Sequence, residues 1–276
     1  FRISVFSPKK GEFATVFEDI TLKKRAEEEI KKLNEELEFR VRKRTAELEA
    51  ANHDMESFSY SVSHDLRAPL RVIRSFSSIL ARKYVDNLDD EGIHYLHNIV
   101  DATERMGTLI DDILLYSRTG RKSVQKKPIS IRNVLEEVLD DLNENIKAKN
   151  AVVNIPHDMP TITSDRTLLN QIFINIIGNA LTYQEPDKKP EIDIFWQKNE
   201  DTIRICMRDN GIGIPEKYHG HVFKIFQRLH SESTYSGTGI GLAIARKAAE
   251  LMEGSLWIES SQKGQGTTFC LELPLK

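Results

Sequence analysis

Cysteine is scarce in this chain of 276 residues, which carries only Cys206 and Cys270. Their spacing matches no metal-ligand pattern, and so few cysteines indicate a reducing compartment and no disulfide framework. Long apolar runs are also missing, because none approaches the roughly 20 residues that a membrane-spanning helix needs. A formal net charge of −3 argues against general binding of nucleic acid.

A secretory signal is absent from the start of the chain as well, so we expect a cytoplasmic protein. The chain begins at Phe1 rather than Met, which indicates a fragment of a longer protein. A membrane tether in a region outside this fragment stays open as an alternative.

The first 21 residues consist mainly of two strand-like runs, FRISVFS and EFATVFEDI, with the turn-like PKKG between them. Two strands do not form a stable domain alone. We therefore expect residues 1–21 to be the last strands of a larger sheet whose other strands lie outside this chain.

Glycine is absent and proline occurs once, at Pro69, between Leu22 and Lys83, where charged residues are dense. This composition predicts a long helix. Its apolar residues repeat at seven-residue spacing in two series, Ile30 and Leu37, then Val41, Leu48, Met55 and Val62. The four-residue step between the series is a stutter in a heptad seam. We expect a parallel coiled coil over residues 22–56, with a charged single surface helix as the alternative.

A second helix is expected over roughly Glu91–Arg118, after the turn-like segment YVDNLDDEG. Its apolar residues gather on one side: Ile93, Leu96, Ile99, Val100, Met106, Ile110, Ile113 and Leu114. Two long antiparallel helices with apolar stripes make half of a four-helix bundle. Residues 57–119 therefore predict a dimeric antiparallel four-helix bundle, and the basic stretch 120–127 reads as a linker.

After Pro128 the chain alternates between helical and strand-like patterns. Helices are predicted over VLEEVLDDLNENIKAK and over SDRTLLNQIFINIIGNALTY, the second with Ser164 or Asp165 as its N-cap. The strand-like runs are AVVNI, EIDIFWQK, TIRICMRD, GSLWIES and TTFCLELPL. This mixture predicts an α+β sandwich over residues 128–276, in a multi-domain chain that also holds the coiled coil and the all-α bundle.

Three glycine-containing turns punctuate this domain. DNGIGIP begins with Asp209 and holds Gly211 and Gly213, GTGIGLAI opens a helix, and GQGT ends at Thr267. Glycine lets the backbone approach a ligand closely, and an acid beside it can accept a hydrogen bond from an amine such as that of adenine. The exposed N–H groups at the start of a helix bind phosphate. Each turn alone could be structural, but their order favours a nucleotide site.

Asn175 and Asn179 are four residues apart in NIIGNALTY and therefore share one face of an apolar helix. Buried amides are costly unless they are paired, and backbone carbonyls could satisfy them in a purely structural role. The alternative is a magnesium site, because Mg²⁺ prefers oxygen ligands together with waters and phosphate oxygens.

The stretch SYSVSHDLRAPLR places His64 directly before Asp65 and five residues before Pro69. An imidazole with a pKa of about 6.5 is a competent nucleophile at neutral pH. A neighbouring carboxylate can hold one tautomer and stabilise the ring as it gains charge. Pro69 removes a helical hydrogen bond to the Asp65 carbonyl and favours a bend there. The structural alternative is an exposed helical histidine beside an aspartate.

Taken in order, these motifs resemble a sensor histidine kinase of two-component signalling. The order is His-Asp followed by Pro-Leu, then Asn-x-x-x-Asn-Ala, Asp-x-Gly-x-Gly, Phe-x-x-Phe-x-Arg and Gly-x-Gly-x-Gly. The C-terminal domain is similar to the ATP-binding fold of gyrase-type ATPases. The run EFATVFEDITLKKRA resembles the exit from a PAS sensor domain, and RLHSESTYSGTGIGLAI resembles phytochrome-like kinases.

The resemblance implies a role for each matching residue. His64 would be the phosphoacceptor and Asp65 the residue that orients or deprotonates it. Asn175 and Asn179 would bind magnesium, and Asp209 would recognise adenine. The remaining ATP-binding residues that the resemblance implies are Tyr183, Gly211, Gly213, Phe223, Phe226, Arg228, Gly237, Thr238, Gly239, Gly241, Leu242 and Thr267.

The implied function is autophosphorylation of a homodimer from Mg-ATP and transfer to an aspartate of a response regulator. The rivals are an ATPase machine of the gyrase type and a coiled-coil interaction module. Two departures from the family pattern stand out. Ala68 replaces the Thr or Asn that helps to position water for dephosphorylating the partner, which implies weak phosphatase activity. Thr182 replaces a basic residue, so one phosphate contact is expected to be missing.

Overall fold

The computed structural model describes residues 2–6, 9, 11, 14–84, 88–119, 124–229, 235 and 237–275. Its chain divides into two compact units, residues 1–58 and residues 59–276. The predicted linker over 120–127 lies partly outside the described residues, at 120–123. No helix in the described part of the chain is both long and apolar enough to cross a membrane.

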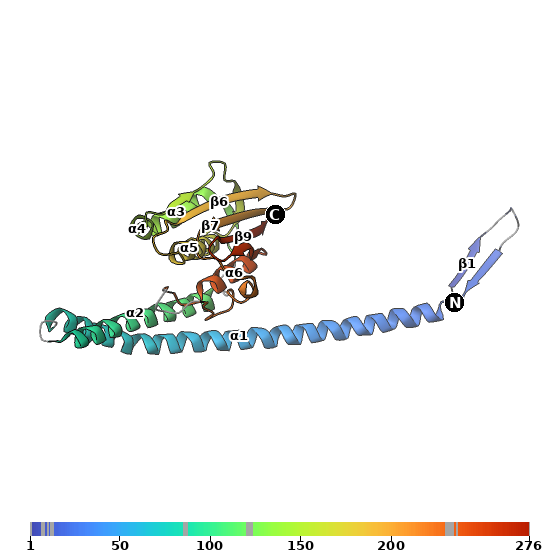
Figure 1. The fold of residues 1–276 in the computed structure, drawn as a ribbon. Coiled ribbons are helices and arrows are strands. Elements are labelled where there is room, and N and C mark those ends of the chain that lie inside the picture. The colour runs from blue at the N-terminus through green and yellow to red at the C-terminus, as the bar shows by residue number, and fades with distance from the viewer. Residues whose placement is uncertain are drawn as a thin grey trace. The chain divides into compact units, whose positions relative to one another are not determined.

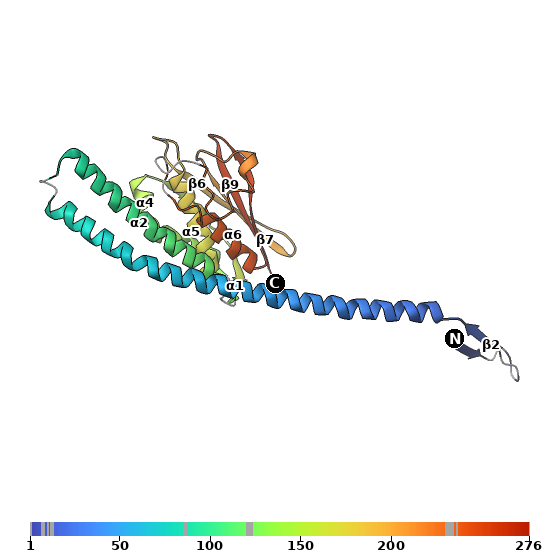
Figure 2. The ribbon, with the colours of Figure 1, turned by 90° about the horizontal axis from the view of Figure 1, so that it is seen from below.

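The first unit opens with the antiparallel strands β1 (Arg2–Phe6) and β2 (Ala14–Glu18), labelled in Figures 1 and 2. Helix α1 (Thr21–Lys83) follows, and it starts where Asp19 accepts hydrogen bonds from the amide and hydroxyl of Thr21. The heptad residues Ile30, Leu37 and Val41 are exposed. The side chains of Leu48 and Met55 lie outside the described residues. The coiled coil therefore stays a prediction.

The second unit starts with a helical hairpin, which comprises α1 from Ser59 onward and α2 (Asp90–Arg118), as Figure 2 shows. The Asp89 carboxylate caps α2 by accepting a hydrogen bond from the Gly92 amide. A small cluster of buried residues, Leu70, Ile110 and Leu114, joins the two helices. Helix α1 continues through Pro69, so the proline does not end it.

The sandwich, residues 124–275, is built on a five-stranded sheet in the order β4-β6-β7-β9-β8. Its strands are β4 (Val152–Asn154), β6 (Glu191–Lys198), β7 (Thr202–Asp209), β8 (Ser255–Gln262) and β9 (Gly266–Pro274). Only the β4–β6 pairing is parallel, and the other three are antiparallel. Inward residues alternate along the strands: Ile203, Ile205 and Met207 of β7 point into one buried core.

Helices cover one face of this sheet (Figure 1). They are α3 (Ile131–Asp141), α4 (Asn143–Ala148), α5 (Arg166–Thr182) and α6 (Gly241–Leu251), with a short 3-10 turn η2 (Glu216–Tyr218). The N-cap of α5 is Asp165, whose side chain accepts from two backbone amides. The single helix predicted over residues 134–149 is divided into α3 and α4 at Leu142.

Two short strands, β3 (Lys127–Ser130) and β5 (Thr161–Ser164), pair in a small separate sheet that the sequence analysis did not predict. The Gln125 amide also donates to Asp165, and Lys126 pairs with Glu253. Residues 125–127, expected to be linker, therefore already belong to the sandwich.

Cys206 and Cys270 form a disulfide, so the expectation of no disulfide framework is wrong. They are direct partners in the antiparallel register of β7 and β9, with Cα atoms 4.1 Å apart. Residues opposite each other in such a ladder have close Cβ atoms. Because this register is a tertiary property, the spacing of two cysteines along the sequence could not reveal it.

Candidate nucleotide site and phosphoacceptor

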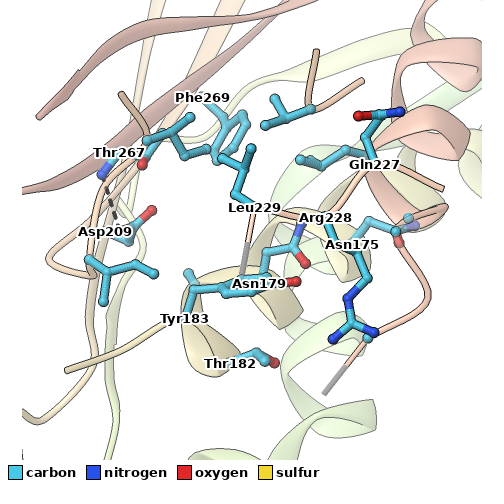
Figure 3. A pocket seen from close by; sticks show the side chains of 18 of the residues that line it. Asn175, Asn179, Thr182, Tyr183, Asp209, Gln227, Arg228, Leu229, Thr267 and Phe269 are labelled. Atoms are coloured by element: carbon cyan, nitrogen blue, oxygen red, sulfur yellow. Dashed lines mark hydrogen bonds between the residues drawn. The ribbon is translucent and has the colours of Figure 1, made fainter. Parts of the chain in front are cut away.

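A cavity opens beside the second half of α5, where the end of β7 and the start of β9 meet the start of α6. Figure 3 shows Asp209 and Thr267 at one end, Asn175 and Arg228 at the other, and Asn179 and Tyr183 between them. Of the residues predicted to bind a nucleotide, those that line the cavity are Asn175, Asn179, Tyr183, Asp209, Gly213, Arg228, Gly237, Thr238, Gly239, Gly241, Leu242 and Thr267.

Asp209, the last residue of β7, forms one end of the cavity. Its Oδ1 accepts hydrogen bonds from the Gly211 amide at 2.8 Å and from the Thr267 amide at 3.1 Å. Burial raises the pKa of Asp209 above its ordinary value, and these two bonds oppose that rise. Both bonds use one carboxylate oxygen, so the other can accept a hydrogen bond from a ligand.

Gly213 shows why this end of the cavity needs glycine. Its φ of 72° lies in the left-handed region, and a Cβ there would stand 1.9 Å from the carbonyl oxygen of Gln262. Only a residue without a side chain fits that position. The glycine thus lets the turn after β7 press against the end of β8.

Tyr183, directly after α5, lines the middle of the cavity. Its ring lies 5.3 Å from that of Tyr235, whose hydroxyl donates to the Gln184 carbonyl. Burial raises the pKa of Tyr183, and the nearby Arg228 charge lowers it. Arg228 itself donates to the Tyr235 carbonyl at 2.8 Å. These contacts tie the described part of the 215–237 segment to the end of α5.

The amides of α5 make the other end polar. Asn175 Nδ2 donates to the Gln171 carbonyl at 2.7 Å, and its Oδ1 faces the start of α6. A Cβ on Gly241 would stand 2.3 Å from that oxygen, so a larger residue where α6 begins would displace the Asn175 amide. Asn179, one turn later, also lines the cavity. The Asn175 oxygen therefore lies where the glycine-rich turn ends.

His64 lies on the hairpin, with 73% of its side chain exposed. Its Nδ1 is 3.2 Å from Oδ1 of Asp65. One turn later Ala68 is exposed too. Nearby, Arg67 pairs with Asp111 of α2 and so joins the two helices of the hairpin. The histidine is therefore open to a reaction partner and has a carboxylate on one ring nitrogen.

Two family models match the chain. Residues 54–122 match the His Kinase A (phospho-acceptor) domain, and residues 164–276 match the histidine kinase-, DNA gyrase B-, and HSP90-like ATPase. The chain carries the two domains of a protein-histidine kinase. From here on, residues 124–275, the sandwich, are called the ATPase domain.

Curated relatives are similar to this chain over most of its length. The chain is 36% identical over 230 residues to cyanobacterial phytochrome A of a Nostoc species, covering 83% of this chain and 30% of that protein. It is 33% identical over 235 residues to the methanogenesis regulatory histidine kinase FilI of Methanothrix harundinacea, covering 85% of this chain and 26% of FilI. The chain thus spans less than a third of either relative.

Among solved structures, full-length ShkA in complex with AMPPNP has a TM-score of 0.60 and 23% identity to this chain. The match covers 78% of this chain and 45% of ShkA. At this identity the likeness shows the shared fold. It confirms the prediction of a helical hairpin followed by a mixed α/β sandwich.

Three of the residues predicted to bind a nucleotide lie outside the cavity lining. Gly211 contributes only its amide to Asp209. Phe223 is buried edge-on against Phe269 in the core, and Phe226 is 58% exposed with a φ of 62°. Of the Phe-x-x-Phe-x-Arg motif, Phe223 thus packs in the core and Phe226 is exposed, while Arg228 lines the cavity.

Sequence reasoning missed most of the apolar wall of the cavity. The wall includes Ile212, Ile214, Val222, Leu229 and Phe269, which look like ordinary core residues in the sequence. It also missed Asp112, which comes from α2 of the hairpin. Nothing in the local sequence around Asp112 marks it, because its place in the cavity depends on how α2 meets the ATPase domain.

Proposed function

We propose that this chain is the core of a sensor histidine kinase that transfers the γ-phosphoryl group of Mg-ATP to His64 and then to an aspartate of a response regulator. The observation that carries the proposal is the exposed His64 imidazole with Asp65 at its Nδ1, in one chain with the cavity of the ATPase domain. The two matched domains and the kinase relatives support it.

His64 would react through Nε2. A proton on Nδ1 donates to the Asp65 carboxylate, which leaves the lone pair of Nε2 free for attack. As Nε2 bonds to the γ-phosphorus, the bond between that phosphorus and the bridging oxygen breaks, and ADP leaves. The ring gains positive charge in this step, which the Asp65 carboxylate stabilises.

The cavity suits an adenine nucleotide from end to end. Asp209 has a free acceptor oxygen for the exocyclic amine of adenine, and Tyr183 offers its ring to the base. The backbone of Gly237–Gly241, at the start of α6, suits phosphate groups.

The donor set at the phosphate end also fits magnesium. Asn175 uses its amide nitrogen on the Gln171 carbonyl, so its oxygen is the group turned toward the start of α6. Asn175 and Asn179 would hold the ion, which prefers oxygen ligands. Bound magnesium would neutralise phosphate charge, and the residues of the chain would orient the phosphates.

The hairpin is proposed to dimerise. Val72, Phe76 and Leu80 recur at four-residue spacing on α1 and are exposed in the single chain. A second hairpin would cover this stripe and complete a four-helix bundle. The exposed heptad residues of α1 are proposed to continue the dimer as a coiled coil, after a PAS-like sensor domain to which β1 and β2 belong.

The proposed kinase has weak phosphatase activity. Ala68 lies one turn after His64, and its methyl group cannot hydrogen-bond a water that attacks the phospho-aspartate of the partner. Shut-off would then depend on hydrolysis by the response regulator itself or on another protein.

The decisive experiment is phosphoamino-acid analysis after incubation with labelled ATP and magnesium. We expect acid-labile phosphate on the chain, lost in His64→Gln and kept in the control His97→Gln, which changes another exposed histidine of the hairpin. Nucleotide binding should survive in both variants. ATP hydrolysis without phosphate on the chain would favour the gyrase-type ATPase, and neither binding nor hydrolysis would favour an interaction module.

A further inference from the structure

The cavity is not built by the ATPase domain alone, because Asp112 of α2 also lines it. Its Oδ2 accepts a hydrogen bond from the Thr238 hydroxyl at 2.5 Å. Thr238 stands between Gly237 and Gly239, in the turn that leads into α6. The carboxylate therefore lies at the glycine-rich end of the cavity.

A second contact lies one turn further along α2. Lys247 of α6 donates from Nζ to the Tyr116 carbonyl at 2.8 Å, and the same ammonium lies 4.3 Å from the centre of the Tyr116 ring. Figure 2 shows α6 beside this end of α2. The ATPase domain thus contacts the hairpin at two neighbouring points. At one of them the Asp112 carboxylate lies against the turn before α6.

Asp112 differs from the acid next to it. Asp111 forms an ion pair with Arg67, whereas Asp112 forms no ion pair with any residue that the structure describes. Burial raises the pKa of Asp112, the hydrogen bond from Thr238 opposes this rise, and the Asp111 charge adds to it. A half-buried carboxylate without a cation is therefore held against a turn that suits anions.

We propose that the Asp112 carboxylate competes with the terminal phosphates of the nucleotide for Thr238 and the glycine-rich turn, so that triphosphate binding releases this turn from α2. The inference rests on the proposed function and deepens it. Two anions at one site repel strongly where water is partly excluded. Nucleotide binding is then coupled to separation of the ATPase domain from the hairpin.

This competition makes the effect depend on ligand charge. If nine in ten molecules hold Asp112 on Thr238, the apparent Kd for a triphosphate is about tenfold weaker than the intrinsic one. A diphosphate reaches less far toward Thr238 and should feel a smaller effect. Adenosine has no phosphate and should feel none.

The test is isothermal titration of the full chain with the magnesium complex of the non-hydrolysable analogue AMPPNP, with ADP and with adenosine. Asp112→Ala removes both the charge and the contact, while Asp112→Asn keeps an acceptor for Thr238 and removes only the charge. Asp111→Asn is the matched control, since it changes the net charge equally but does not line the cavity.

We expect Asp112→Ala to bind AMPPNP about tenfold more tightly than the natural chain, ADP by less, and adenosine unchanged. Asp112→Asn should show most of this gain at low ionic strength and little of it at high salt, because salt screens the repulsion. Asp111→Asn should bind all three ligands as the natural chain does.

Equal affinity of the natural chain and both Asp112 variants would overturn the inference alone. Weaker binding by the variants would overturn it too, and would make Asp112 a residue that helps to hold the nucleotide. If the Asp112 variants bind adenosine more tightly by the same factor as AMPPNP, Asp112 does not compete with phosphate groups. No binding by any variant would reject the proposed function, and this inference with it.

Discussion

In the ATPase domain, the side chains of Ile172, Phe173 and Ile177 have no exposed surface, whereas in the hairpin Val72 is 54% and Phe76 64% exposed. Both regions are rich in apolar residues at helical spacing. In the ATPase domain a sheet covers the apolar face of α5, and in the hairpin only a narrow seam lies between α1 and α2.

This difference indicates which region can bury its core without a second chain. The ATPase domain buries one continuous core of three helices and a sheet, as a self-contained layer structure does. The hairpin leaves large apolar side chains such as Val72 and Phe76 exposed, which is typical of half a bundle. We therefore expect mutations in the two regions to be felt in different measurements.

The largest effect is expected from Phe173→Ala. Truncating a fully buried phenylalanine costs about 3–5 kcal/mol, since it loses apolar contacts and leaves a cavity. Both tryptophans, Trp196 and Trp257, lie in the ATPase domain, so their fluorescence during urea unfolding follows this domain. The matched control Phe76→Ala in the hairpin should leave that transition in place. If the urea midpoint of Phe173→Ala equals that of the natural chain, Phe173 does not lie in a tightly packed core.

The next largest effect is expected from Phe76→Asp, which puts a charge on the open face of α1. A buried central residue of an interface contributes about 2 kcal/mol or more, so the dimer Kd should rise at least about 30-fold. Sedimentation equilibrium measures it. Phe195→Asp makes the same change at an exposed phenylalanine of β6 and should leave dimerisation intact. A dimer that is equally weakened by both changes would argue against the hairpin as the interface.

A smaller effect is expected from Asp209→Asn. Losing the acceptor for the adenine amine should weaken nucleotide binding by about 1–3 kcal/mol. Titration with tripolyphosphate, which has no base, is the control and should be unaffected. If ATP and tripolyphosphate lose affinity equally, Asp209 does not recognise adenine.

The stability of the same variant should change in the opposite sense. Burial raises the pKa of Asp209, so the folded state disfavours the ionised carboxylate at pH values above the unfolded pKa. This cost declines as the pH falls below the raised pKa, where the folded carboxylate takes up a proton, and it is gone below the unfolded pKa. An asparagine is never charged and keeps an oxygen for Gly211 and Thr267. At neutral pH the variant should therefore unfold no earlier than the natural chain, and the two curves should converge at acidic pH.

The smallest structural effect is expected from Ala68→Thr on the exposed side of α1. Threonine costs up to about 0.7 kcal/mol in helix propensity, and its hydroxyl can orient a water. Phospho-regulator should then decay faster in its presence, with autophosphorylation retained. Ala68→Val, which is β-branched without a hydroxyl, is the matched control. Rapid decay with the natural chain would show that another side chain positions the water.

Much of the fold was predictable because local pattern and tertiary surroundings agree. The bounds of β6 and β7 match the runs EIDIFWQK and TIRICMRD, whose alternation places every second residue in the core. The sequence offers Ser164 and Asp165 as N-cap candidates for α5, and the side chain of Asp165 is the one that accepts hydrogen bonds from backbone amides. Strands β3 and β5 escaped prediction because each carries a single buried apolar residue, Ile129 or Ile162, and so shows no repeating pattern.

The sequence by itself determined the residue types of the site, since Asp209, the amides of α5 and the glycines before α6 follow from motifs within single segments. The tertiary structure alone decided which residues face each other across segments. Register set Cys206 opposite Cys270, and the meeting of α2 with α6 brought Asp112 to Thr238. Pattern along a chain reports the periodicity of one element, while contacts between elements depend on how whole surfaces pack.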